Sequence, residues 1–134
     1  MEKIRADLLQ KLKREMERAD ITFAENVPMS RYTSFKAGGN AAVLAEVCDT
    51  DRLRALLALT FQEGVPHILL GNGSNTLFSD AGFGGAVICL TGLNSRFSMQ
   101  AQPDGSTKVL APAGMMLSAL CNTAQKESLA GLEF

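Results

Sequence analysis

Residues 42–71 read AVLAEVCDTDRLRALLALTFQEGVPHILLG, and this stretch decides the fold. Its opening segment, 42–47, is an apolar run of the length expected for a buried strand. Leucines then recur at helical spacing, and Asp49 or Thr50 is suited to cap a helix that begins near Asp51. The first half of the stretch therefore predicts a strand followed by a helix.

The second half of the same stretch ends the helix and begins another strand. Gly64 stands where the C-terminus of a helix favours a left-handed residue, and Pro66 follows it. Residues 67–70 form a second apolar run, which ends at Gly71. A strand–helix–strand unit joins parallel strands through a right-handed crossover. We therefore expect segments 42–47 and 67–70 to be parallel neighbours in one sheet.

Further elements are expected on both sides of this unit. Residues 3–18 place apolar side chains every four residues, which predicts an amphipathic helix. We expect a connector over residues 20–29, because Pro28 disfavours continued helix. After the unit we expect a glycine-rich loop at 71–85, a strand at 86–90, a hairpin of strands 96–102 and 107–111, and a helix at 117–126.

The local pattern changes from strand–helix–strand to hairpin near residues 91–95, which indicates a boundary between two lobes. We expect an N-terminal helix and connector over residues 1–29, a first lobe over 30–93, and the start of a second lobe over 94–134. The combination of a parallel unit with an antiparallel hairpin predicts an α+β fold.

The composition excludes several classes of function. The 134 residues are 46% hydrophobic and 20% charged, with a net charge of −1, as is usual for a packed soluble domain. The chain lacks the excess of Lys and Arg that a nucleic-acid surface needs, and it has no apolar run of membrane-spanning length. The polar residues near its start lead us to expect no signal peptide. We expect a cytoplasmic protein with neither nucleic-acid nor membrane partners.

The three cysteines, Cys48, Cys89 and Cys121, are widely spaced and are accompanied by a single histidine, His67. Structural zinc sites need closely spaced Cys or His ligands, so we expect no metal site. In a reducing compartment we expect these residues to be buried, free thiols.

The glycine loop after the second strand is the strongest local indication of chemistry. It reads Leu69-Leu70-Gly71-Asn72-Gly73-Ser74-Asn75-Thr76-Leu77. Glycine lets the backbone turn sharply, so that successive N–H groups face one concavity and bind a phosphate. A Rossmann fingerprint would need glycine in place of Thr76, and a P-loop would need a lysine that residues 71–85 lack. By itself this loop is either a diphosphate cradle or an ordinary turn.

Five segments, in order along the chain, resemble motifs of the UDP-N-acetylenolpyruvoylglucosamine reductases. Each motif is modest alone, but the ordered series is specific to that family. The segments are Ser30-Arg31-Tyr32-Thr33-Ser34-Phe35-Lys36-Ala37-Gly38-Gly39, Leu70-Gly71-Asn72-Gly73-Ser74-Asn75, Gly82-Phe83-Gly84-Gly85-Ala86-Val87-Ile88, Ala113-Gly114-Met115-Met116-Leu117 and Gly131-Leu132-Glu133-Phe134.

The resemblance implies the two-lobed FAD-binding module shared with flavoproteins of the vanillyl-alcohol-oxidase (PCMH) type. In this family NADPH reduces the flavin, which passes hydride to UDP-N-acetylglucosamine enolpyruvate. The product, UDP-N-acetylmuramate, serves peptidoglycan synthesis and thereby cell-wall biogenesis, cell shape and cell division. The residues that the resemblance places on the cofactor are Gly71, Asn72, Gly73, Ser74 and Asn75, around the FAD diphosphate, and Ala113 and Gly114, from the second lobe.

The resemblance ends before the family's catalytic arginine, serine and glutamate, so no catalytic residue is carried over to this chain. We therefore expect the isolated chain to bind FAD weakly or not at all, and to oxidise NADPH negligibly. Tyr32 and His67 are interpreted as packing residues. Two alternatives stay open: an FAD oxidoreductase of the same superfamily with another substrate, and a non-catalytic remnant without a cofactor.

Overall fold

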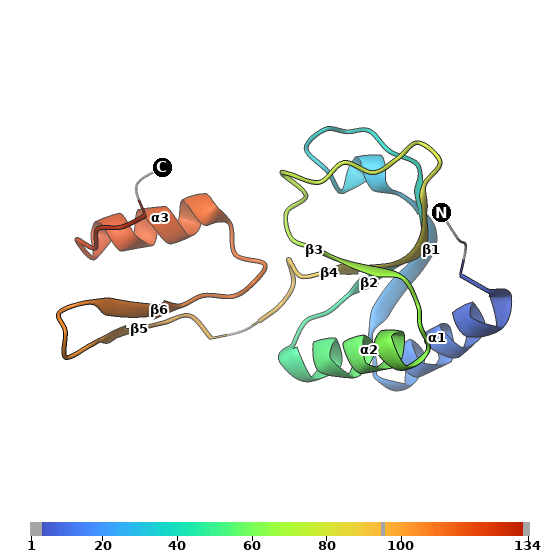
Figure 1. Ribbon diagram of the computed structural model, residues 1–134, viewed down its shortest axis with the longest axis horizontal. Helices are drawn as coiled ribbons and strands as arrows, with labels where there is room; N and C mark the ends of the chain where they lie inside the picture. The colour runs from blue at the N-terminus through green and yellow to red at the C-terminus, as the bar shows by residue number, and fades with distance from the viewer. Residues whose placement is uncertain (1–3, 95, 133–134) are drawn as a thin grey trace.

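The computed structural model describes residues 4–94 and 96–132, so Glu133 and Phe134 of the last motif lie outside the described residues. Figure 1 shows a helix-covered sheet in the first part of the chain, and a hairpin with a helix in the second. The elements are α1 (Ala6–Arg18), β1 (Thr22–Pro28), the 3-10 helix η1 (Met29–Arg31), β2 (Asn40–Glu46), α2 (Thr50–Gln62), β3 (His67–Leu70), β4 (Phe83–Cys89), β5 (Ser98–Ala101), β6 (Thr107–Leu110) and α3 (Leu117–Lys126).

The four strands of the larger sheet lie in the order β1-β2-β4-β3. β4 is parallel to both β2 and β3, whereas β1 is antiparallel to β2. Segments 42–47 and 67–70 are therefore parallel, as predicted, but the prediction that they are neighbours is wrong, because β4 lies between them. Every residue of β4 except Gly84 is buried, and such a strand belongs at the centre, where both of its faces are covered.

The prediction of a connector over residues 20–29 is also wrong, because Thr22–Pro28 forms the edge strand β1. Only Val27 of this strand is fully buried, so the sequence lacks the apolar run that identifies a central strand. Pro28 is tolerated because it is the last residue of an edge strand, where a missing N–H has little cost.

The two faces of the larger sheet are covered differently. One face packs against α1 and α2, and Leu12 and Met16 of α1 are buried there as the predicted amphipathic helix requires. On the opposite face the described chain places loops 29–39 and 71–82, which include only the single turn η1 (Figure 1). Phe78 of the second loop is buried against that face. The two loops that carry the family-like motifs therefore form a layer of their own.

The second part of the chain contains the predicted hairpin and helix. β5 and β6 pair antiparallel, and α3 has the predicted bounds. In the turn between the strands Gly105 has a φ of +84°, and the Ser106 N–H donates to Asp104 Oδ1 at 2.9 Å. The described chain is thus α+β, with one mixed sheet and one antiparallel hairpin.

The three cysteines differ in exposure. Cys89 is buried, Cys121 is half-buried and Cys48 is exposed, so the expectation of buried thiols is correct for Cys89 only. Cys48 is exposed because it lies between the end of β2 and the cap of α2, at the surface. Among the described residues, no group of three His, Cys, Asp or Glu side chains is placed to hold a metal ion. None of the helices in the described ranges is both long and apolar enough to cross a bilayer.

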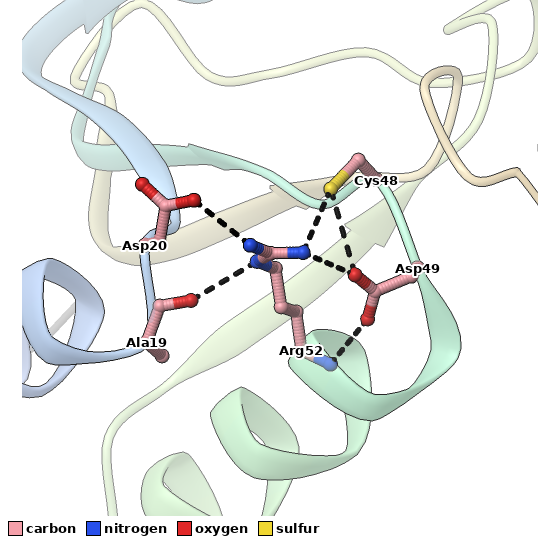
Figure 2. Close-up of polar contacts among 5 residues, drawn as sticks. All are labelled: Ala19, Asp20, Cys48, Asp49 and Arg52. Atoms are coloured by element: carbon pink, nitrogen blue, oxygen red, sulfur yellow. Dashed lines mark hydrogen bonds and ion pairs between the residues drawn. The ribbon is translucent and has the colours of Figure 1, made fainter.

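Arg52 joins the end of α1 to the start of α2 (Figure 2). Its Nε donates to the Ala19 carbonyl at 3.0 Å, and its Nη2 donates to Asp20 Oδ2 at 2.8 Å. Its Nη1 pairs with Asp49 Oδ2, and Asp49 Oδ1 accepts a hydrogen bond from the Arg52 N–H at 2.8 Å. Asp49 is therefore the cap of α2. The Arg52 N–H and then its guanidinium hold the pKa of Asp49 below its ordinary value.

We expect this pKa shift to make the folding stability depend on Asp49 in acid. Because the folded-state pKa lies below the ordinary value of 3.8, the carboxylate stabilises the fold above that pH and loses this contribution as the pH falls. Asparagine caps helices as well as aspartate does, so Asp49→Asn removes the charge and keeps the cap. In urea unfolding, D49N should be less stable than the native chain at neutral pH, and the difference should narrow below pH 3.8.

A difference between D49N and the native chain that is the same at every pH would contradict this assignment. The control is Asp51→Asn, because the Asp51 side chain is 92% exposed and contacts only Arg54 among the charged groups of the described chain. The effect of D51N on the free energy of unfolding should be small at every pH, as is usual for an exposed ion pair.

Candidate functional site

The carboxyl ends of β2, β4 and β3 meet at one edge of the sheet, because the three strands are parallel. Glu46 ends β2, Thr91 follows β4, and Gly71 and Asn72 follow β3. In open α/β sheets ligands bind in the crevice outside this edge. The carboxyl edge is therefore the first place where a site is expected.

A hollow of about 290 Å³ opens at this edge. It brings residues 31–34 of the first family-like motif together with Gly71 and Asn72 of the glycine loop. Arg31 and Glu46 put one cationic and one anionic side chain on its wall, and neither forms an ion pair within the described part of the chain. The hollow therefore offers charge of both signs to a ligand. Its other lining residues are Cys89 and Thr91.

Two other hollows lie away from the predicted residues. One, of about 370 Å³, separates α1 from α2 and is lined largely by small and apolar side chains such as Ala55. The other, of about 670 Å³, lies at the amino ends of β2 and β4, beside Asn40 and Asp80. Neither contains a residue of the 71–75 loop or of the 113–114 turn, so the smaller hollow at the carboxyl edge is the better candidate.

The first motif supports the glycine loop through backbone contacts. The Ser34 N–H donates to the Gly73 carbonyl at 3.0 Å. Gly73 has a φ of +64°, and a Cβ at this residue would lie 2.0 Å from the Tyr32 carbonyl oxygen. The fold therefore requires glycine here. The Tyr32 side chain is half-buried on the loop-covered face of the sheet, in agreement with its interpretation as a packing residue.

The N–H groups of the glycine loop remain available. Within the described residues, the backbone N–H groups of Asn72, Ser74 and Asn75 donate to no protein acceptor, and all three residues are exposed. They surround Gly73, whose left-handed conformation is of the kind found where successive N–H groups form an anion-binding concavity. The loop therefore has the donors that a diphosphate needs.

Gly71 differs from Gly73 because a side chain at Gly71 would not collide with the rest of the described protein. A Cβ at Gly71 would have no heavy atom within 4 Å, and its φ is not in the left-handed region. The residue is half-buried and lies on the wall of the hollow. Nothing within the described protein therefore requires glycine at this position. A ligand that closely approaches the backbone would require it, because a side chain would block that approach.

The Ala113-Gly114 turn reaches the same edge from the second part of the chain. The Met115 N–H donates to the Pro112 carbonyl at 2.9 Å and closes the turn. A Cβ at Gly114 would lie 1.9 Å from the Leu90 carbonyl oxygen, just beyond β4. Asn72 Nδ2 donates to the Gly114 carbonyl at 3.3 Å. The structure thus brings Gly114 to the glycine loop, while Ala113 lies exposed beside it.

Sequence reasoning missed Glu46 and Thr91, which line the same hollow. The signal that could have found them is their position, since each lies at or just beyond the carboxyl end of a parallel strand. His67 lies at the opposite end of β3, and its ring packs edge-on against Phe61 with 4.9 Å between the centroids. This contact agrees with the interpretation of His67 as a packing residue.

Comparison with known proteins now identifies the family. The chain is 34% identical over 128 residues to the UDP-N-acetylenolpyruvoylglucosamine reductase of Clostridium novyi (strain NT), which covers 96% of this chain and 39% of the relative. It is 39% identical over 127 residues to the reductase of that name from Caldanaerobacter subterraneus subsp. tengcongensis, covering 95% of this chain and 39% of the relative. The chain belongs to the UDP-N-acetylenolpyruvoylglucosamine reductase family.

A third relative of the family is similar over a shorter range. UDP-N-acetylenolpyruvoylglucosamine reductase 2 of Symbiobacterium thermophilum is 42% identical over 107 residues, covering 80% of this chain and 33% of the relative. The chain therefore spans less than two fifths of the length of these three relatives. No family model matches the chain.

Proposed function

We propose that this chain supplies part of the FAD-binding cleft of a UDP-N-acetylenolpyruvoylglucosamine reductase, with residues 71–75 on the FAD diphosphate. The observation that carries this proposal is the group of unengaged N–H donors in the glycine loop, at the carboxyl edge of a parallel sheet. An anion gains charge-assisted hydrogen bonds there, and the loop has no lysine that would serve instead.

The residues of the hollow fit the parts of a dinucleotide. The Arg31 guanidinium and the loop N–H groups favour phosphate oxygens, whereas the Glu46 carboxylate repels them and accepts hydrogen bonds from hydroxyl groups. We therefore place the diphosphate at the Gly73 side of the hollow and a sugar or ribityl chain at the Glu46 side. Bound FAD would supply hydride-transfer chemistry, and the residues of this chain hold and orient it.

We further propose that residues 30–93 form the first lobe of the cleft and residues 94–134 begin the second, in a module of the vanillyl-alcohol-oxidase (PCMH) type. The separate sheets of the two parts and the docking of Gly114 against Leu90 support this division. The cofactor would lie where the glycine loop faces the 112–115 turn, with Ala113 and Gly114 contributing from the second lobe.

For the whole protein we propose the reaction that the relatives' names describe. FAD would supply hydride transfer between NADPH and UDP-N-acetylglucosamine enolpyruvate, giving UDP-N-acetylmuramate for peptidoglycan synthesis in the cytoplasm. The role of the present residues in this reaction is to bind the cofactor and set its orientation. The proton donor and the groups that stabilise the enolic intermediate are assigned to other parts of the enzyme.

Flavin titration of the purified chain tests the proposal. FAD should bind about 100-fold more tightly than riboflavin, because hydrogen bonds to a charged group contribute about 1.5–3 kcal/mol each and riboflavin has no phosphate. ADP should compete with FAD, and adenosine should compete far less. Quenching of flavin fluorescence measures these affinities. Equal affinities for FAD and riboflavin would show that the glycine loop is not a diphosphate site.

A further inference from the structure

We propose that the Asn72 side chain does not bind the cofactor but latches the glycine loop to the 112–115 turn, and so sets the width of the cleft. The family resemblance places Asn72 among the residues that wrap the FAD diphosphate. In the described part of the structure the backbone N–H of Asn72 donates to no protein acceptor, whereas its side-chain amide donates a hydrogen bond to the second part of the chain.

The contact joins residues that are far apart in the sequence. Asn72 Nδ2 donates to the Gly114 carbonyl at 3.3 Å, across a sequence separation of 42 residues. Asn72 lies directly after β3, and Gly114 lies between the hairpin and α3. A side chain that binds the second part of the chain in this way has its amide donor engaged by the Gly114 carbonyl, so we assign it the role of a positioning residue.

The 112–115 turn is also held by a second contact, with Leu90, so its position relative to the glycine loop is defined from two sides. Gly114 packs so closely on Leu90 that a Cβ would lie 1.9 Å from the Leu90 carbonyl oxygen. The Leu90 N–H in turn donates to the Leu70 carbonyl at 2.8 Å, immediately before the glycine loop. The turn is therefore held between the end of β4 and the Asn72 side chain. Both supports originate from strand ends that the sheet fixes.

The strength of the two supports differs. The backbone contact of Gly114 with Leu90 depends only on the absence of a Cβ, whereas the Asn72 bond is exposed and at 3.3 Å is long for an N–H···O bond. Such a bond is weak enough to break and reform. The latch therefore restricts the angle between the two parts without fixing it, and loss of the Asn72 donor should widen the range of separations that the cleft samples.

The native cysteines provide a direct measurement of this range. Cys48 is exposed in the first part of the chain, Cys121 is half-buried on α3, and the buried Cys89 can be changed to serine to keep it unlabelled. Spin labels on Cys48 and Cys121 report the distance between the parts by double electron–electron resonance. Asn72→Ala and Asn72→Asp should both broaden the distance distribution, because neither side chain can donate to the Gly114 carbonyl.

The matched control is Asn75→Ala in the same loop, since Asn75 makes no hydrogen bond to the turn within the described residues. It should weaken FAD binding but leave the distance distribution unchanged. Asn72→Ala should broaden the distribution and also raise the FAD Kd by about threefold to tenfold, as loss of one exposed hydrogen bond would. Thermal melting of each variant confirms that the fold is retained.

Only the flavin part of this prediction rests on the proposed function. If the native chain binds FAD and riboflavin with equal affinity but Asn72→Ala broadens the distances, the proposed function fails and the latch stands. If both Asn72 variants leave the distance distribution unchanged, Asn72 is an ordinary surface hydrogen bond and the latch is refuted, whatever the flavin affinities are.

Discussion

Replacing Gly73 by alanine is expected to destabilise the fold by about 2–5 kcal/mol, through two separate costs. The first is the left-handed φ of +64°, which costs an alanine about 1–2 kcal/mol. The second is the contact with the Tyr32 carbonyl oxygen, which a Cβ would approach to 2.0 Å. Backbone must move to relieve that contact, at a cost of about 1–3 kcal/mol. Small domains have a total stability of about 5–15 kcal/mol, so the loss should be large in urea unfolding.

Gly64→Ala separates the two costs. Gly64 has the same φ of +64°, but a Cβ there would have no heavy atom within 4 Å. Its replacement should therefore show the conformational cost alone, about 1–2 kcal/mol. The difference between G73A and G64A measures the close packing of the first motif on the glycine loop. Equal losses in the two variants would mean that the loop moves freely away from Tyr32 and is not supported by it.

The helices and turns of this chain were predictable because each is encoded by neighbouring residues. Asp49 caps α2, Gly64 adopts the left-handed conformation after it, and α3 has the predicted bounds. The order of the strands was not predictable in the same way. A strand–helix–strand pattern gives the relative direction of two strands, but it does not reveal that a later segment, β4, will lie between them.

The edge strand β1 was missed for a related reason. Six of its seven residues are at least partly exposed with no clear alternation, and Pro28 at its end is typical of a loop. Its place is fixed by pairing with β2, which is a tertiary contact. Sequence patterns therefore located strands that have an apolar run or a clear turn beside them, and they failed at this polar edge strand, which a neighbouring strand holds in place.

The candidate site was likewise predictable only in part from the sequence. The motifs located the glycine loop and the 113–114 turn, and the structure brings the loop and Gly114 together through Asn72. Sequence alone could not distinguish Gly71 from Gly73, because both follow a strand in a loop of small polar residues. Only the surrounding atoms separate them: Gly73 is fixed by the Tyr32 carbonyl, whereas Gly71 faces the open hollow.

This difference makes Gly71→Val the decisive change for the proposed cofactor site. Because a Cβ at Gly71 meets nothing in the described protein, the free energy of unfolding should change by no more than about 0.5 kcal/mol. The added side chain occupies the space that a diphosphate needs to approach the loop backbone. Loss of two charge-assisted hydrogen bonds would raise the FAD Kd about 100-fold or more.

The same valine placed at Gly92 is the matched control for Gly71→Val. Gly92 is an exposed loop glycine without a left-handed φ, its Cβ would lie 3.5 Å from the Val47 carbonyl oxygen, and it does not line the hollow. G92V should retain both stability and flavin affinity. Flavin fluorescence gives the Kd, and thermal melting of the same samples gives the stability. If G71V binds FAD as tightly as G92V, the diphosphate does not contact this loop, because a branched side chain at Gly71 would have to lie between the two.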